Sequence, residues 1–202
     1  MKKILKLLTV LMIIPIVSGC GNVNKYNVYE KLYNCYNSMH SFKAEIAVTL
    51  YSNNSENKYT LTQLYKSPDK QRSEYVSETG NSNVTVINGD SGKIISDYTN
   101  GAYMFESSEE ADFLMLNTFF DLYYSSEETS VKTSGGEKDS KITLNAETGS
   151  SNPYRKTVEL TVDAKTLNPV KLKVKDNKGK TRIEIDYIKF ELNPQIDDAV
   201  FE

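Results

Sequence analysis

The side chains of this 202-residue chain offer little for catalysis. His40 is the only histidine, so a histidine-rich zinc site or a serine–histidine–aspartate arrangement would depend on that one residue. The sequence has no nucleophile elbow, no His-Glu-x-x-His run and no glycine-rich phosphate loop. His40 falls at the end of a predicted helix, where interaction with the helix dipole is the simpler interpretation. We therefore expect no enzyme activity, no metal ion and no cofactor.

The acidic residues do not predict a catalytic pair either. Adjacent carboxylates occur at Glu109/Glu110, Glu127/Glu128 and Asp197/Asp198. Glycoside hydrolysis needs two carboxylates that converge on one cleft, whereas sequence neighbours in polar segments are more simply surface groups. Direct hydrolysis is therefore the least favoured class of function.

Cys20 is the residue with the clearest chemistry. Three lysines stand within the first six residues, residues 4–17 are mostly apolar, and Ser18-Gly19 lie directly before Cys20. A basic lead, an apolar core and small residues at the cleavage site are the parts of a secretory signal. The pattern resembles the lipobox of bacterial lipoproteins, in which the cysteine is acylated. The apolar run is too short for a spanning helix, which needs about 20 apolar residues.

These features predict the processing of the chain. We expect residues 1–19 to be a signal peptide, residues 20–27 a lipidated tether, and residues 28–202 a single domain. The acylated Cys20, carrying palmitate or a similar chain, would hold the protein on the extracytoplasmic side of the cell membrane. An uncleaved anchor or an ordinary signal peptide is the alternative.

Net charge restricts the class of binding partner, and cysteine content restricts the disulfides that the chain can form. The formal net charge is −3 before loss of the three lead lysines, and an acidic chain argues against nucleic acid as a partner. With Cys20 acylated, Cys35 has no disulfide partner, and its place on a predicted helix suits a small buried hydrophobe.

Hydrophobic periodicity predicts two helices and many short strands. Apolar residues recur every three or four positions over 28–39 and again over 109–124, where the helix should be buried against a sheet or form a lid over it. From Phe42 the period changes to two, which indicates a strand with one buried face. Residues 125–140 read as a polar connection. A change of phase near Tyr187 predicts a β-bulge. The further strands are expected around 59–65, 72–76, 84–87, 93–98, 102–105, 142–144, 158–162, 170–174 and 183–192.

This order of elements predicts an α+β fold. We expect a strongly curved antiparallel β-sheet, a half-barrel, with helices packed on its concave face. Lys171, Lys173 and Lys175 should form a basic row on the outer face. The row is either a solubilising surface that protects an edge strand or a docking surface for an acidic protein or for wall polymers.

Several segments together resemble the lipoprotein-localisation fold, the family of periplasmic lipoprotein carriers and their anchored relatives. The matching segments are Met39-His40-Ser41-Phe42-Lys43-Ala44, the hairpin from Tyr65 through Pro68 to Glu74, Val86-Ile87-Asn88-Gly89-Asp90, and the C-terminal segment from Phe190 to Phe201. Within that fold the chain is most similar to the GerS-like spore-germination lipoproteins of clostridia.

The resemblance implies a function. Proteins of the GerS type bind a cell-wall amidase of the CwlD type, an N-acetylmuramoyl-L-alanine amidase, and enable it to modify the spore cortex. The partner would then supply the zinc and the catalytic groups, and the protein would lie in the forespore intermembrane space. Lys171, Lys173 and Lys175, with the hairpin arginine Arg72, are the candidate partner-binding residues.

An alternative hypothesis assigns the same fold a different function. The chain would then be a lipid- or lipoprotein-binding carrier that uses an apolar concave pocket. Two departures weaken a carrier role: Ser73 stands where carriers have an aromatic residue, and carriers are commonly not anchored. A helix around Phe113–Phe120 that fills the concavity would also leave no room for an acyl chain. Exposed sheet edges additionally allow a homodimer.

Overall fold

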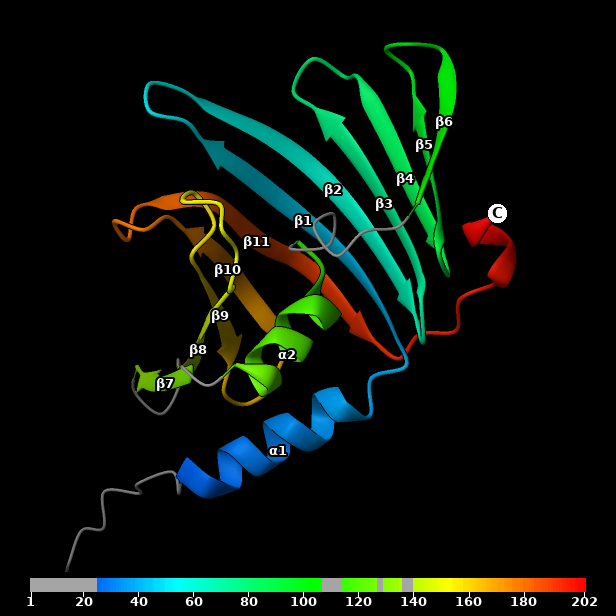
Figure 1. The fold of residues 1–202 in the computed structure, drawn as a ribbon. Coiled ribbons are helices and arrows are strands. Elements are labelled where there is room, and N and C mark those ends of the chain that lie inside the picture. Colours follow the sequence, from blue (N-terminus) through cyan, green and yellow to red (C-terminus); the bar gives the residue numbers. More distant parts are fainter. Residues whose placement is uncertain (1–24, 107–113, 127–128, 136–139) are drawn as a thin grey trace, which may run out of the picture.

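The computed structural model describes residues 25–106, 114–126, 129–135 and 140–202. Within these ranges, one large sheet accounts for most of the chain, and the helices lie on one side of it or at its ends (Figure 1). The helical elements are α1 (Lys25–Asn37), α2 (Leu116–Ser125) and the 3₁₀ turn η2 (Asp198–Phe201). The strands are β1 (Ser41–Tyr51), β2 (Glu56–Lys66), β3 (Lys70–Ser77), β4 (Ser82–Asn88), β5 (Ser91–Ser96), β6 (Gly101–Glu106), β7 (Thr129–Ser134), β8 (Lys141–Glu147), β9 (Thr157–Asp163), β10 (Pro169–Lys175) and β11 (Thr181–Leu192).

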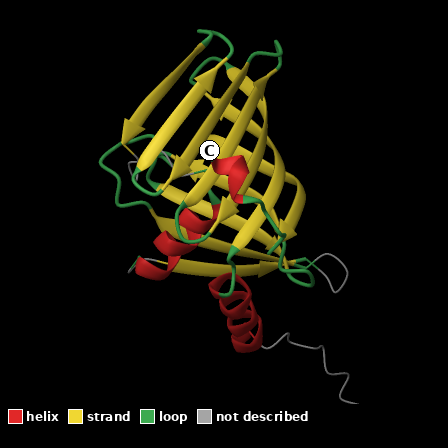
Figure 2. Ribbon diagram, turned by 90° about the vertical axis from the view of Figure 1, so that its right-hand side faces the viewer, coloured by secondary structure: helices red, strands yellow, loops and turns green. Residues whose placement is uncertain are grey.

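The sheet consists of two antiparallel meanders joined at their centre. Its strand order is β6-β5-β4-β3-β2-β1-β11-β10-β9-β8-β7, so β6 and β7 are the edges. The first strand pairs with the last, and Phe42 lies opposite Leu192. This is the curved antiparallel half-barrel that the sequence predicts, and Figure 2 shows its curvature from the side.

Alternating side chains explain why the sheet has a concave core. Inward-facing residues of β1, β8, β9 and β10 are fully or almost fully buried, while their neighbours in sequence face outward. The inward set of these four strands includes Phe42, Ala44, Ile46, Val48, Ile142, Leu144, Val158, Leu160, Val162, Leu172 and Val174. Burial of this apolar surface is the main contribution to stability.

A β-bulge bends β11 at the predicted place. The pairing with β1 shifts between Glu45 and Ile46, which lie opposite Lys189 and Tyr187. Ile188 is thus the extra residue, and its side chain is exposed. A bulge increases the local twist, which helps this central strand to curve around the core.

Helix α2 lies in the concavity, and α1 packs beneath it (Figure 1). Leu116, Phe119 and Phe120 of α2 are buried. The ring of Tyr36 in α1 stacks on that of Phe120 with 3.9 Å between centroids, and the Tyr36 hydroxyl donates to the Leu167 carbonyl at 2.6 Å. Helices therefore lie on the concave face of the half-barrel, and this part of the predicted fold is confirmed.

Some predicted boundaries are wrong. Helix α1 begins at Lys25, inside the expected tether, and ends at Asn37 rather than Met39. The second helix begins at Leu116, because residues 114 and 115 form a turn and a bend, whereas the predicted start at 109–113 lies outside the described residues. Strand β7 lies within the predicted polar connection at 125–140. It is an exposed edge strand, so it lacks the apolar alternation by which a strand is recognised.

Candidate interaction surfaces

His40 and the acidic residues do not assemble into a metal-binding cluster in the described part of the chain. No cluster of three or more histidine, cysteine, aspartate or glutamate residues there could hold a metal ion. Because α1 ends at Asn37, His40 belongs to the link before β1, which corrects its predicted role at the helix end. Its backbone N–H donates to the Asn193 side-chain oxygen at 2.9 Å, and its carbonyl accepts from Ser67 N–H at 2.8 Å. Both contacts are made by the backbone of His40, and they fasten this link to Asn193 and to the turn between β2 and β3.

Cys35 packs on the core as predicted. It is a free, half-buried cysteine beside the core cluster. Burial raises the pKa of its thiol above the ordinary value, so the nucleophilic thiolate is disfavoured.

The concave face contains a cavity of about 280 Å³ between strands β2 to β6 and residues 114 and 115, which directly precede α2. Its lining combines amide and hydroxyl groups with apolar side chains and contains no charged residue among those described. The lining residues are Gln63, Gln71, Ser73, Tyr75, Thr85, Ile87, Ile94, Phe105, Leu114 and Met115. Gln63 is fully buried and donates through Nε2 to the Leu114 carbonyl at 3.0 Å. The cavity is at the small end of ligand pockets, and its mixed lining does not suit a long acyl chain.

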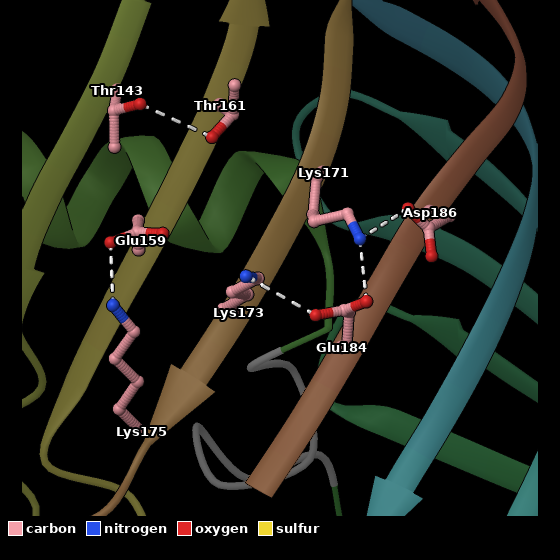
Figure 3. Close-up of polar contacts among 8 residues, drawn as sticks. All are labelled: Thr143, Glu159, Thr161, Lys171, Lys173, Lys175, Glu184 and Asp186. Carbon is pink, nitrogen blue, oxygen red and sulfur yellow. Dashed lines mark hydrogen bonds and ion pairs between the residues drawn. The ribbon is translucent and has the colours of Figure 1, made fainter. Parts of the chain in front are cut away.

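The outer-face lysines of β10 are matched by acids on the neighbouring strands (Figure 3). The Lys171 ammonium lies 2.6 Å from Glu184 and 2.9 Å from Asp186. Lys173 lies 3.4 Å from Glu184, and Lys175 lies 2.7 Å from Glu159. The hydrogen bond from Lys171 lowers the pKa of Glu184, with partial burial opposing it. The row is therefore charge-balanced.

The position of β10 corrects one interpretation of this row. The strand lies between β9 and β11, so its lysines do not protect a sheet edge. Cross-strand ion pairs stabilise a sheet modestly. A docking role remains a proposal, but a partner would have to compete with Glu159, Glu184 and Asp186 for these ammonium groups.

Arg72 lies on the convex face, where the chain's last residues pack over β3 and β4 (Figure 2). Its guanidinium donates to the Val200 carbonyl at 3.4 Å and lies 3.8 Å from the Glu74 carboxylate. Lys66 and Lys70 bind Asp198 at 2.6 and 3.2 Å. The hairpin cations therefore hold η2 in place, a role that sequence reasoning missed because the acceptors are about 130 residues away.

The two sheet edges differ in chemistry. Strand β7 carries threonine, serine and lysine side chains that are mostly exposed. Strand β6, its neighbour β5 and the turn between them instead expose large apolar side chains. We call these residues the β5–β6 edge: Ile94, Ile95, Tyr98, Tyr103 and Met104. An exposed apolar edge with unpaired backbone groups is a site for pairing with another chain. The apolar run Ala-Tyr-Met-Phe at 102–105 is visible in the sequence, but the sequence alone does not show that this strand lies at the edge of the sheet.

None of the helices in the described ranges is long and apolar enough to span a bilayer.

Solved structures that share this fold include the following two. A chain in the structure of the CwlD amidase from Clostridioides difficile in complex with the GerS lipoprotein is 26% identical, with 83% of this chain and 95% of that chain covered and a TM-score of 0.50. An uncharacterized conserved protein from Thermus thermophilus is 11% identical, with 88% and 91% covered and a TM-score of 0.57, and supports the fold alone.

The sequence comparisons point to sporulation. The sporulation protein YdcC of Bacillus subtilis is 23% identical over 215 residues, which span all of this chain but only 61% of that relative. The family model for YdcC-like sporulation proteins matches residues 1–201. Together with the GerS complex, these matches show a GerS-like protein of the lipoprotein-localisation fold. The chain belongs to the YdcC-like family of sporulation proteins.

Proposed function

We propose that this protein is a lipid-anchored, non-catalytic partner of a cell-wall amidase. It binds an N-acetylmuramoyl-L-alanine amidase of the CwlD type and enables that enzyme to modify the spore cortex. The observation that carries the proposal is the likeness to a chain from the complex of CwlD with the GerS lipoprotein. The match covers 95% of that chain and 83% of this one. Membership of a sporulation family supports the same setting. Acylated Cys20 would hold the protein at the membrane on the extracytoplasmic side.

The β5–β6 edge is the surface that we propose for the amidase. Backbone groups at an open sheet edge can accept another strand, and alternate apolar side chains add specificity. Apolar residues at the centre of a patch contribute most to protein interfaces. The β10 lysines and Arg72 are less available, because they already bind acidic or carbonyl groups of this chain.

Affinity purification of the tagged, full-length protein from sporulating cells tests the function. We expect the amidase to be recovered with it, and cortex muramic-lactam to be lost when the protein is deleted. Recovery of no amidase, or normal muramic-lactam in the deletion strain, contradicts the proposed function.

A matched pair of variants tests the surface. Met104→Glu places a charge on the β5–β6 edge, and Ile188→Glu makes the same type of change at a similarly exposed position on the central bulge. We expect Met104→Glu to reduce amidase recovery at least tenfold, about 1.4 kcal/mol of binding free energy, with Ile188→Glu unchanged. Equal recovery with both variants would assign the interface to another face while leaving the function intact.

The carrier function remains the alternative. The cavity beside α2 favours a small ligand, but α2 fills the concavity with Leu116, Phe119 and Phe120. Mass spectrometry of lipids extracted from a purified Cys20→Ser variant would distinguish the two. A stoichiometric co-purified lipid would favour the carrier, and its absence favours the amidase partner.

A further inference from the structure

Four tyrosines gather where the two helices meet at the open side of the half-barrel. Tyr29 and Tyr33 come from α1, and Tyr123 and Tyr124 come from α2. The rings of Tyr33 and Tyr124 meet edge to face with 5.2 Å between centroids, and those of Tyr123 and Tyr124 lie 5.6 Å apart. We call these four residues the tyrosine patch.

The tyrosine patch surrounds a shallow apolar hollow of about 240 Å³. Its floor consists of Leu32, Val131 and Leu144, and no charged side chain lines it among the described residues. Tyr33 and Tyr124 are 47% and 46% exposed, so their rings are half buried and half accessible. Tyrosine combines an apolar ring with a polar hydroxyl, which is why it is enriched where apolar and aqueous regions meet.

The length of the chain before α1 places this patch near the lipid anchor. Lys25 follows Cys20 by five residues, and at about 3.6 Å per residue the two are separated by about 18 Å at most. A helix rises 1.5 Å per residue, so Tyr29 and Tyr33 lie about 6 and 12 Å along α1. An acyl chain on Cys20 therefore keeps the patch within a short distance of the bilayer surface.

The β5–β6 edge lies far from this end of the molecule. In Figure 1, α1 lies below the half-barrel, while the β5–β6 hairpin turn is at the top of the opposite half of the sheet. The second exposed apolar surface is thus remote from the anchored segment. Of the two, the tyrosine patch is the one that a short tether brings to lipid.

We propose that the tyrosine patch contacts the headgroup region of the phospholipid bilayer. The contact would orient the domain, so that the β5–β6 edge faces away from the membrane and toward the amidase. The proposal rests on acylation of Cys20, as in the proposed function, because the tether provides the high local concentration that a small patch needs. The uncharged lining predicts that the contact persists at high salt, where attraction to anionic lipid is screened.

The lack of tryptophan in the chain permits a direct test. The full-length lipidated protein is reconstituted into phosphatidylcholine vesicles whose acyl chains carry bromine near the headgroup, a quencher of indole fluorescence. Tyr33→Trp and Tyr124→Trp each introduce one reporter into the patch. Tyr98→Trp, at an 81% exposed position on the β5–β6 turn, is the matched control. Flotation with the vesicles is measured on the same samples.

The expected result separates the patch from the anchor. All three variants should float, and Tyr33→Trp and Tyr124→Trp should lose fluorescence relative to unbrominated vesicles, while Tyr98→Trp should not. Floating protein with no loss at the patch, or with equal loss at all three positions, overturns the bilayer contact but keeps the anchor. Protein that does not float overturns the anchor and the contact that depends on it. Neither of these two outcomes bears on amidase recovery.

Discussion

Asn193 links the end of β11 to residues 38–41, about 150 positions earlier in the sequence. Its side-chain oxygen accepts from the backbone N–H groups of His40 and Ser41 at 2.9 and 3.3 Å, and its amide nitrogen donates to the Ser38 carbonyl at 3.3 Å. Its φ of 56° lies in the left-handed region, which asparagine tolerates better than most residues. The end of β11 is thereby fastened to the link between α1 and β1.

Two substitutions at Asn193 should separate these roles. Asn193→Gly keeps the backbone conformation but loses the side-chain hydrogen bonds, so we expect the free energy of unfolding to fall by about 1–3 kcal/mol. Asn193→Ala should cost about 1 kcal/mol more, because alanine disfavours positive φ. Urea denaturation measures both. Equal losses would show that the backbone conformation contributes nothing.

Asp163 should make stability depend on pH in the acidic range. The Thr166 backbone N–H, at 3.0 Å, is the largest cause that lowers its pKa to about 2; partial burial opposes it, and the Lys165 N–H and the Lys141 ammonium add to it. The unfolded pKa is about 3.9, so this stabilisation is complete above about pH 4 and is lost as the pH falls toward 2.

Asp163→Asn provides the measurement. Asparagine keeps an oxygen that accepts the turn's N–H bonds but does not titrate. The difference in unfolding free energy between the natural protein and the variant should be about 1 kcal/mol at neutral pH, because solvent screens part of the interaction. It should shrink between pH 4 and 2. A difference that does not change with pH would contradict this assignment.

At the scale of elements, α2 packs into the concave face of the sheet and completes the core. The strands of a half-barrel leave one face of the sheet open, and the apolar face of α2 covers it with Leu116, Phe119 and Phe120. Aromatic contacts continue from Phe120 to Tyr36 of α1. Neither helix therefore depends on its own propensity for stability.

Removing one aromatic ring from α2 should be costly. Phe120→Ala should lower the free energy of unfolding by about 3–5 kcal/mol, because it leaves a cavity against Tyr36. Asp121→Asn, on the exposed side of the same helix, should change it by about 0.5 kcal/mol or less. Thermal unfolding followed by circular dichroism compares the two. A small effect of Phe120→Ala would mean that α2 is a loosely held lid.

At the scale of the whole molecule, Cys20 should control location without controlling the fold. Cys20→Ser removes the thiol that we propose to be acylated, and we expect the protein to move from the membrane fraction to the extracytoplasmic soluble fraction. The melting temperature of the domain should not change, because its core is built from residues after 31. Fractionation and calorimetry check these outcomes. Retention in the membrane would indicate another anchor, such as an uncleaved signal segment.

Local patterns account for what could be predicted. The alternation of Phe42, Ala44 and Ile46 indicates a half-buried strand whatever its neighbours are, and the change of phase at Tyr187 indicates a bulge. Turn residues such as Asn88-Gly89 separate the strands at the expected places. These features depend on residues close together in the sequence, so one chain is sufficient to infer them.

Pairing between distant strands accounts for what was missed. The ion pairs of Lys171 and Lys175 depend on the register of β10 against β11 and β9, which alternation alone does not specify. The identity of the edge strands follows from the pairing of β1 with β11. Without that pairing, the apolar residues of β6 could not be recognised as an exposed surface.

The central seam between β1 and β11 also has a consequence for how the chain folds. Each meander consists of consecutive hairpins that can form early, but the seam joins residues about 150 positions apart. Closure of so long a loop is entropically costly and slows folding. If the chain is exported from its N-terminus, as the proposed function implies, β1 must remain unpaired with β11 until β11 has also crossed the membrane.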